Sequence, residues 1–146
     1  MLVDIGAGNG AFTNSLVQSV GGEWATIVEP SKEFMTGVHA YRYPSIVAVH
    51  ASLEEWSKAE RAAGAPPAGR FDRMLLKEMV HHLGDSNERH ESLHQLRAHR
   101  LTPNARLLIV TRHQEQPQMP LFSAARKVWA EQQPSGDELV ADLERA

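Results

Sequence analysis

The sequence predicts an α/β fold, a doubly wound parallel sheet with helices on both faces. Two observations support this class: short apolar runs alternate with helical patterns five times, and the first run leads through a glycine-rich turn into a helix. Strands that alternate with helices form parallel sheets, and right-handed crossovers place the first strand at the centre. Ligands bind such sheets in the crevice at the carboxyl ends of the strands.

The first half of the chain is predicted to hold three strands and three helices. The strands are Leu2–Ile5, Trp24–Val28 and Ile46–Val49. The first helix runs from Asn9 or Gly10 to Val20 and ends at Gly21–Gly22, and its apolar residues at helical spacing are Phe12, Leu16, Val17 and Val20. Ser31 can cap the second helix, and a third helical stretch runs from Ser52 through Trp56 to Ala59.

The second half continues the alternation after a loop. The segment AGAPPAG (Ala63–Gly69) is a surface connection, because consecutive prolines among glycines do not continue a helix. The elements expected after it are strands at Phe71–Leu76 and Leu107–Thr111, and helices at about Ser86–Arg100, at Pro120–Gln133 and at Ser135–Ala146. The Pro120–Gln133 helix is expected to pack on the sheet through Leu121, Phe122, Val128 and Trp129.

Composition limits the classes of function. The chain has 146 residues, 42% of them hydrophobic, with a formal net charge of −3 and no cysteine. This length suits a single domain over residues 1–146, and the missing cysteines exclude disulfides and thiolate sites. The mild acidity disfavours a general nucleic-acid binder, and no apolar run is long enough for a membrane span. We therefore expect no nucleic-acid or membrane partner and a cytoplasmic location.

The glycine turn, with an acid placed after it, predicts a nucleoside-containing cofactor. In MLVDIGAGNG, Gly6, Gly8 and Gly10 permit tight turning and close approach of a ligand to the backbone. The following helix presents its positive N-terminal end to that ligand. Glu29 ends the next strand at a spacing typical of an acid that accepts hydrogen bonds from ribose hydroxyls.

Asp4 distinguishes two cofactor classes that the glycines alone do not separate. GAGNGA also fits the dinucleotide pattern G-x-G-x-x-A, which keeps an NAD-dependent oxidoreductase as the less favoured alternative. A carboxylate beside the turn would repel a pyrophosphate, whereas it can hold the cationic end of S-adenosylmethionine (SAM), directly or through water. The other interpretation of Asp4 is a strand aspartate that only caps the glycine loop.

Five motifs in order resemble the class I SAM-dependent methyltransferases, in particular those that act on small molecules. They are VDIGAGNG, IVEPS, VHASLEEW, FDRMLLKEMVHHLGD and RLTPNARLLIV. Asn104–Ala105 stands where the family usually has two glycines, and Ser52 stands where an acid or polar residue often meets the adenine amino group. The resemblance implies a Rossmann-like sheet in the order 3-2-1-4-5, lacking the family's usual last two strands.

The resemblance also implies a set of cofactor contacts and a small-molecule methyl acceptor. The predicted SAM-binding residues are Asp4, Gly6, Ala7, Gly8, Gly10, Glu29, Pro30, Phe34, Ser52, Leu53 and Lys77. Lys77 stands where backbone groups meet the methionine part of the cofactor. Phe34 or Met35 can flank the adenine, although helical spacing also allows both to face the sheet.

The segment after the fourth strand holds the candidates for methyl transfer. Transfer depends mainly on positioning, and a base helps only where the acceptor must lose a proton. Glu78, His81 and His82 are the predicted catalytic residues, since an imidazole accepts a proton near neutral pH. The alternative is that His82 packs at a helix start while His81 faces solvent.

A second motif, HESLH at His90–His94, matches the zinc pattern H-E-x-x-H. Its flanks, NER and QLRAHR, are strongly polar, whereas a zinc-protease helix lies in an apolar cleft. We therefore expect a solvated helix face and no metal.

The chain begins at the first strand and stops where the family usually continues with further strands. The sequence is thus expected to be the cofactor-binding core of a longer enzyme, a fragment or a shortened isoform. The alternative to an active methyltransferase is a catalytically weak or inactive binding module. The fifth strand is expected to leave an exposed sheet edge, through which the chain could self-associate.

Overall fold

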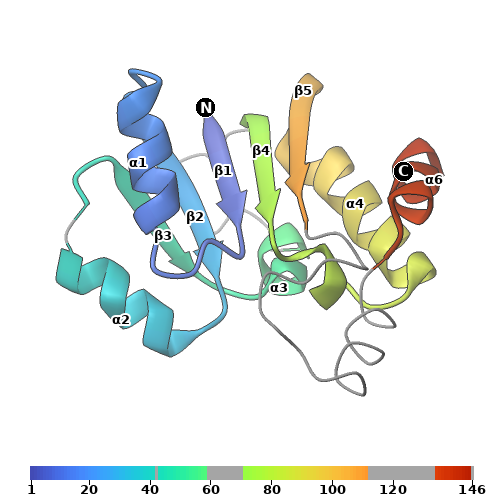
Figure 1. Ribbon diagram of the computed structural model, residues 1–146, viewed down its shortest axis with the longest axis horizontal. Coiled ribbons are helices and arrows are strands. Elements are labelled where there is room, and N and C mark those ends of the chain that lie inside the picture. The colour runs from blue at the N-terminus through green and yellow to red at the C-terminus, as the bar shows by residue number, and fades with distance from the viewer. Residues whose placement is uncertain (42, 59–70, 112–133, 146) are drawn as a thin grey trace.

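The computed structural model describes residues 1–41, 43–58, 71–111 and 134–145 and shows one parallel sheet (Figure 1). Its strand order is β3-β2-β1-β4-β5, as predicted. The strands are β1 (Leu2–Ile5), β2 (Ala25–Glu29), β3 (Ile46–His50), β4 (Phe71–Lys77) and β5 (Leu101–Val110). The helices are α1 (Ala11–Ser19), α2 (Lys32–Tyr41), α3 (Leu53–Lys58), the 3₁₀ turn η1 (Val80–His82), α4 (Ser86–Arg100) and α6 (Gly136–Arg145).

Helices lie on both faces of the sheet, which confirms the doubly wound class. Figure 1 shows α1 and α2 on one face, and α3, α4 and α6 on the other. The larger core fills the second face, where Val3, Met74 and Leu76 of the sheet meet Leu93 and Leu96 of α4. A smaller core lies under α2 and contains Ile27, Met35 and Val38.

The start of α4 is set by a capping box. The Asp85 carboxylate accepts hydrogen bonds from the backbone N–H groups of Asn87 (2.9 Å) and Glu88 (3.1 Å). In return, the Glu88 carboxylate accepts from the Asp85 N–H at 2.9 Å. These bonds satisfy N–H groups that a helix otherwise leaves unpaired, so the predicted helix begins at Ser86 as expected.

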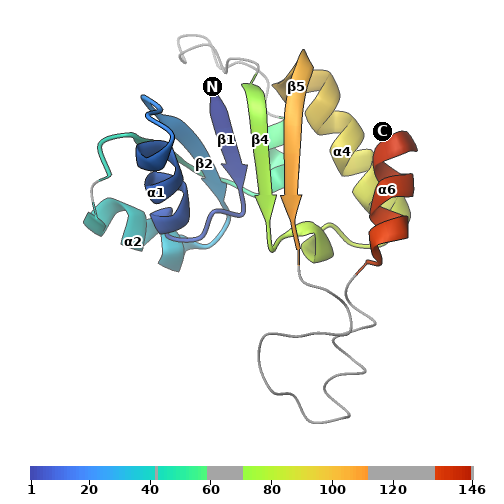
Figure 2. The same cartoon turned by 45° about the horizontal axis from the view of Figure 1, so that its top comes forward.

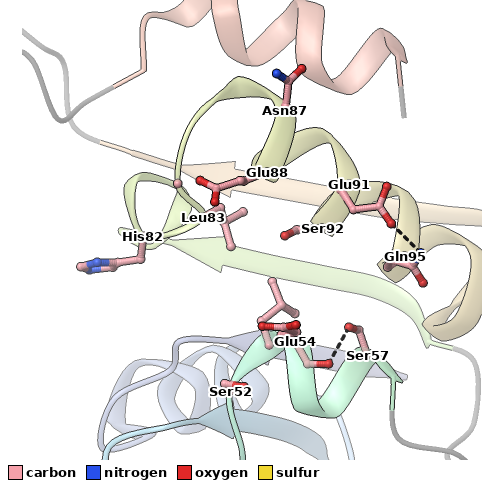
Figure 3. Close-up of a pocket in the computed structure, with 12 residues that line it drawn as sticks. Ser52, Glu54, Ser57, His82, Leu83, Asn87, Glu88, Glu91, Ser92 and Gln95 are labelled. Carbon is pink, nitrogen blue, oxygen red and sulfur yellow. Dashed lines mark hydrogen bonds between the residues drawn. The ribbon is translucent and has the colours of Figure 1, made fainter.

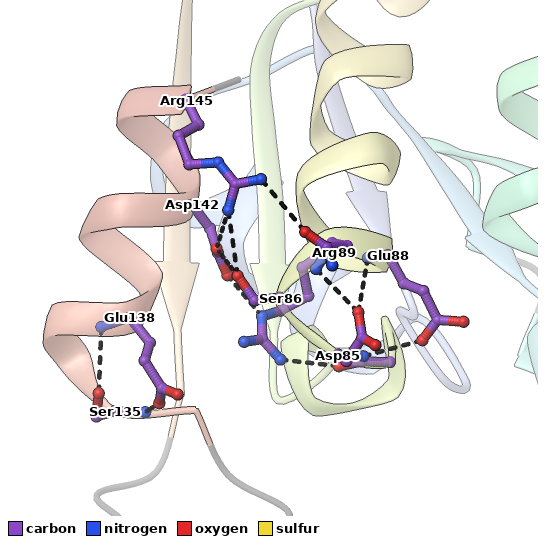
Figure 4. Close-up of polar contacts among 10 residues, drawn as sticks. Asp85, Ser86, Glu88, Arg89, Ser135, Glu138, Asp142 and Arg145 are labelled. Carbon is purple, nitrogen blue, oxygen red and sulfur yellow. Dashed lines mark hydrogen bonds and ion pairs between the residues drawn. The ribbon is translucent and has the colours of Figure 1, made fainter.

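Buried ionic contacts attach α6 to α4 (Figure 4). Asp142 of α6 is 1% exposed and accepts from Arg89 Nε at 2.9 Å and from the Ser86 hydroxyl. Arg89 also donates from Nη1 to the Gly84 carbonyl at 2.8 Å. The pair therefore connects α6 to the turn that follows η1.

Two sequence expectations need correction. The fifth strand begins at Leu101 instead of Leu107, because the backbone becomes extended directly after α4. Between the pairs Phe71↔Leu101 and Arg73↔Arg106 the register shifts, and this irregular stretch contains Pro103, which has no N–H to donate. On α1, Val17 is buried, whereas Phe12 and Val20 are exposed because α1 covers β2 and leaves part of its apolar side open.

Some predicted elements lie outside the described residues. They are Ala59 at the end of the third helical stretch, the Ala63–Gly69 loop and the Pro120–Gln133 helix with its apolar residues. Among the helices that are described, none combines the length and the apolar character needed to cross a membrane.

Candidate functional site

The carboxyl ends of β1, β2 and β4 bring the predicted cofactor residues together. β1 pairs with β2 and β4, and the register places Ile5 beside both Val28 and Leu76. The glycine turn, Glu29 and Lys77 therefore all follow the same level of the sheet. This is the edge at which parallel α/β sheets bind ligands.

The glycine turn has the backbone that its sequence demands. Gly6, Gly8 and Gly10 have φ values of 71°, 59° and 73°, a left-handed region that side chains with a Cβ rarely adopt. At Gly6 an added Cβ would also lie 3.0 Å from the Met79 Cβ. At Gly8 an added Cβ would meet nothing within 4 Å, so this turn position faces open space. Ala7 lies between them and accepts from the Gly10 N–H at 3.1 Å.

Glu29 holds the turn against the start of α2. Its side chain is 6% exposed; one oxygen accepts from the Gly8 N–H at 2.9 Å and the other from the Ser31 N–H at 2.8 Å. The Gly6 N–H donates to the Val28 carbonyl at 2.8 Å. The described hydrogen bonds of the turn thus come from Glu29, the Asn9 side chain and the backbone. They do not support the interpretation of Asp4 as its cap.

Asp4 is a buried carboxylate under the turn. It is 2% exposed, and one oxygen accepts a hydrogen bond from the Thr13 hydroxyl. Its other oxygen, Oδ1, is buried and has no hydrogen-bond partner among the described residues. Burial raises the pKa of Asp4 from 3.8 to about 6, although the Thr13 bond and the charge of Lys77 act in the opposite direction.

The end of β4 contributes a cation and a strained backbone. Lys77 places its ammonium nitrogen 5.3 Å from the centre of the Phe12 ring, which is within the range of a cation–π contact. Glu78 has φ = 56°, unusual for a residue that is not glycine, and its N–H donates to the Val110 carbonyl at 2.7 Å. Such strain is most often found at functional sites.

His81 and His82 lie in η1, with ring centres 4.0 Å apart. His81 is half-buried and His82 is exposed. The exposures are therefore opposite to the alternative in which His82 packs and His81 faces solvent. The 3₁₀ turn reverses that expectation because it directs Val80 into the core, at 1% exposure.

The residues predicted around the adenine divide between the core and the surface. Met35 is 5% exposed and belongs to the α2 core, whereas Phe34 is 50% exposed and Pro30 is exposed as well. Ser52 caps α3: its hydroxyl accepts from the Glu55 N–H at 3.1 Å, and its own N–H donates to the Glu55 carboxylate. Leu53 packs against the larger core.

A cavity of about 660 Å³ opens between α3 and α4 beside Ser52 and His82 (Figure 3). Glu54 projects into it from α3, and Glu88 and Glu91 line its α4 side. Two of these carboxylates already serve α4, since Glu88 accepts in the capping box and Glu91 accepts from Gln95 Nε2 at 2.7 Å. We therefore assign the cavity no ligand.

The HESLH motif lies on α4, with His90 half-buried and His94 exposed, and ring centres 6.3 Å apart. Across the described parts of the chain, no group of three or more histidine, aspartate or glutamate side chains is arranged to hold a metal ion.

Sequence reasoning missed two residues of the site. Thr13 is completely buried and bonds to Asp4, and Phe12 lies under the Lys77 ammonium group. The available signal for Thr13 was its position one turn before the buried Val17, which places a polar side chain on the inner side of α1.

Comparison with known proteins identifies the fold. No protein-family model and no curated protein matches the chain. Among solved structures, a SAM-dependent methyltransferase from Aquifex aeolicus is 18% identical, with a TM-score of 0.71 over 98% of this chain and 69% of that chain. The N-methyltransferase NodS from Bradyrhizobium japonicum WM9 is 16% identical, with a TM-score of 0.67 over 99% and 70%. The fold is that of SAM-dependent methyltransferases.

A third structure, the DhpI–SAM–HEP complex, is 15% identical, with a TM-score of 0.60 over 77% of this chain. The chain spans about half of the DhpI protein, 46% in this complex and 48% in the DhpI–SAH complex. These likenesses confirm the predicted Rossmann-like fold.

Proposed function

We propose that the chain binds SAM at the carboxyl ends of β1, β2 and β4 and transfers its methyl group to a small molecule. The observation that carries the proposal is the buried Oδ1 of Asp4 beside the glycine turn, which has no hydrogen-bond partner in the described parts of the chain. A buried carboxylate oxygen without a donor costs free energy, so its retention is explained best by a donor that arrives with a ligand.

The charges of the site favour a cationic ligand. Asp4 and Glu29 provide two carboxylates, and Lys77 is the cation that acts on Asp4. SAM carries an ammonium group and a sulfonium, which suit the free oxygen of Asp4. A dinucleotide would bring two phosphate charges to the same two carboxylates, which disfavours the NAD-dependent alternative.

Glu29 is proposed to bind the ribose. A carboxylate has about four acceptor positions, and the two backbone bonds from Gly8 and Ser31 use only two of them. Those bonds also fix the carboxylate in place, so ribose hydroxyls would meet an oriented acceptor. The open space at Gly8 allows the ligand to approach the backbone closely.

The adenine is proposed to lie near Pro30, Phe34, Ser52 and Leu53. Phe34 is the exposed aromatic ring of this group, while Met35 is used by the core. The Ser52 hydroxyl already caps α3, so we expect the half-buried Leu53 to contribute apolar contact.

Methyl transfer is proposed to occur above Lys77 and Glu78. When bound, SAM supplies an electrophilic methyl group. The residues of the chain would orient that group through Asp4 and Lys77 and exclude water from it. His81 and His82 are the proposed acceptors for a proton that the methyl acceptor loses, and the strained Glu78 is proposed to face the same region.

A small-molecule acceptor is proposed because the fold neighbours include NodS, described as an N-methyltransferase, and the DhpI complex with SAM and HEP. The formal charge of −3 disfavours a nucleic-acid substrate.

Calorimetric titration tests the cofactor. We expect S-adenosylhomocysteine to bind and NAD not to bind, and Gly8→Ala to weaken binding at least tenfold, because the added methyl fills the open approach to the turn. Gly21→Ala is the matched control, since Gly21 also has a positive φ (64°) and nothing within 4 Å. Both variants should lose about 1 kcal/mol of stability, and only Gly8→Ala should lose affinity. Heat from NAD alone would refute the proposal.

Methyl transfer to a panel of metabolites separates an enzyme from a binding module. An enzyme should release S-adenosylhomocysteine in the presence of an acceptor, and the double variant His81→Ala/His82→Ala should lose this turnover while it keeps cofactor affinity. Binding without turnover on any acceptor would favour the inactive binding module.

A further inference from the structure

The α1-side surface of β4 and β5 is uncovered among the described residues. We call this surface the β4–β5 face; its exposed residues are Arg73 of β4 and Arg106, Leu108 and Val110 of β5, and Leu75 of β4 lies buried at its base. In β5, Ala105, Leu107 and Ile109 pack on the larger core, so the alternating residues point to the opposite face. Figure 2 shows α1 beside β1 and β2, with no described helix over β4 and β5.

This surface is more apolar than a solvent-facing strand requires. Leu108 is 57% exposed and Val110 is 38% exposed, and the run RLLIV is typical of a strand covered on both sides. Val20 and Trp24, at the end of α1 and before β2, are 66% and 42% exposed. On the outer side of β5, no described strand pairs with it. Apolar surface of this kind indicates an interaction site.

This side of the sheet has a raised half, which α1 covers, and a recessed half, where β4 and β5 have no described helix over them (Figure 2). Beside α1 lies a groove of about 810 Å³, with Leu16 and Val20 on its helix side and Leu75 and Leu108 on its sheet side. Consider a two-fold axis that lies above this face, parallel to the strands and over the boundary between β1 and β4. Rotation about this axis would place α1 of one copy over the uncovered strands of the other. The raised half of each copy then fills the recessed half of its partner.

The charges around the groove are complementary under the same rotation. Glu23 lies before β2 and Arg106 lies in β5, on opposite sides of the axis, and both line the groove. The register links Ala25, Leu2, Arg73 and Arg106 across the sheet, so the two charges lie near one level of the strands. Neither side chain has an ionic partner among the described residues. A two-fold contact would bring Glu23 of each copy to Arg106 of the other.

We propose that the β4–β5 face, together with the exposed end of α1, binds the same surface of a second copy of this chain. The contact is centred on the groove, whose lining reaches from the strand starts to Leu108, whereas the candidate cofactor site follows the carboxyl ends of β1, β2 and β4. The dimer therefore leaves the glycine turn accessible. It would cover the apolar face and give Arg106 an acidic partner.

Sedimentation equilibrium of the whole chain tests the proposal. We expect a dimer whose dissociation constant rises about 100-fold or more in Leu108→Asp, because two carboxylates enter an apolar contact. Val47→Asp is the matched control: Val47 is a 52% exposed valine on β3, the opposite edge strand, and its change should leave the dimer intact.

Charge reversal tests the two-fold arrangement itself with variants that keep the apolar surface. Glu23→Arg and Arg106→Glu should each weaken the dimer about tenfold, and the double variant should return to within about threefold of the wild type. Circular dichroism checks that each variant is folded, and the charge variants decide the question if Leu108→Asp does not fold. A monomeric wild type, equal weakening by Val47→Asp, or a double variant as weak as the single ones would overturn the proposal.

Discussion

At the residue scale, Asp4 carries a charge whose cost to the fold depends on pH. Its pKa is raised to about 6, so the folded protein binds a proton more tightly than the unfolded chain. The folded state therefore loses stability as pH rises from about 4 to 6. Above pH 6 the full loss in the free energy of unfolding is about 3 kcal/mol. The proposed ligand would offset this cost by supplying a cation.

Asp4→Asn should remove this pH-dependent cost. We expect the variant to gain about 2 kcal/mol of stability relative to wild type between pH 4 and pH 7.5, measured by urea unfolding at both values. Asp137→Asn, at an exposed position on α6, is the control and should show no such gain. If the difference in stability between Asp4→Asn and the wild type were the same at both pH values, Asp4 would titrate normally in the folded state.

The affinity for SAM should follow the same titration of Asp4, but it should rise with pH, whereas the stability of the fold falls. Below pH 6 the free protein holds a proton on Asp4, and a cationic ligand must displace it. We expect the affinity to rise about tenfold from pH 5 to pH 7, with proton uptake by the buffer visible in calorimetry. In Asp4→Asn the affinity should be weaker and flat over this range. A flat profile in the wild type would separate Asp4 from ligand binding.

Much of the geometry of the candidate site was predictable residue by residue, because backbone geometry limits the choice of amino acid. The positive φ values of the turn demand glycine, and the spacing of Glu29 follows from one strand–helix–strand unit. The role of Ser52 was harder to predict, since a serine before LEE also suits a capping box. The bond from Thr13 to Asp4 depends on tertiary packing, which the apolar pattern of α1 does not encode.

At the element scale, the attachment of α6 to α4 depends on one buried ion pair. Burial raises the pKa of Asp142, but hydrogen bonds from Ser86 and Arg89 and the nearby positive charges outweigh it and hold that pKa below its usual value. The pair therefore stabilises the fold above about pH 4, and this contribution is lost as the pH falls below that value. Arg89 is itself only 6% exposed, so without Asp142 it would be a buried guanidinium that lacks its carboxylate.

Asp142→Ala should accordingly cost about 3 kcal/mol, since it leaves a buried guanidinium without its counter-charge. Chemical denaturation at neutral pH measures this loss. Glu144→Ala, two positions along the same helix and exposed, is the control and should change stability by less than about 0.5 kcal/mol. Equal effects of the two changes would show that α6 is held by its apolar contacts, such as Leu139, alone.

The order and type of the described elements followed from their patterning, whereas some of their boundaries did not. Strands buried on both faces read as continuous apolar runs, and this made β2 visible in the sequence. β5 begins earlier than its apolar run because its first half pairs irregularly around Pro103, which carries no strand signal.

At the scale of the whole molecule, the two proposed binding surfaces use different parts of the sheet. The cofactor site uses the loops that follow the strands, and the groove of the β4–β5 face runs from the strand starts up to Leu108. Two ligand equilibria that share no residues should stabilise the fold additively. The melting temperature can therefore report both equilibria in one experiment.

The wild-type melting temperature should rise with protein concentration and, independently, with S-adenosylhomocysteine. For a dimer above its dissociation constant, a tenfold higher concentration contributes about 0.7 kcal/mol per protomer, or about 2 °C for a chain of this size. A hundredfold excess of ligand over its dissociation constant contributes about 2.7 kcal/mol, or about 5–10 °C. Leu108→Asp should lose only the first effect and Gly8→Ala only the second. If either change removed both shifts, the two surfaces would be coupled, because independent sites cannot respond to one substitution together.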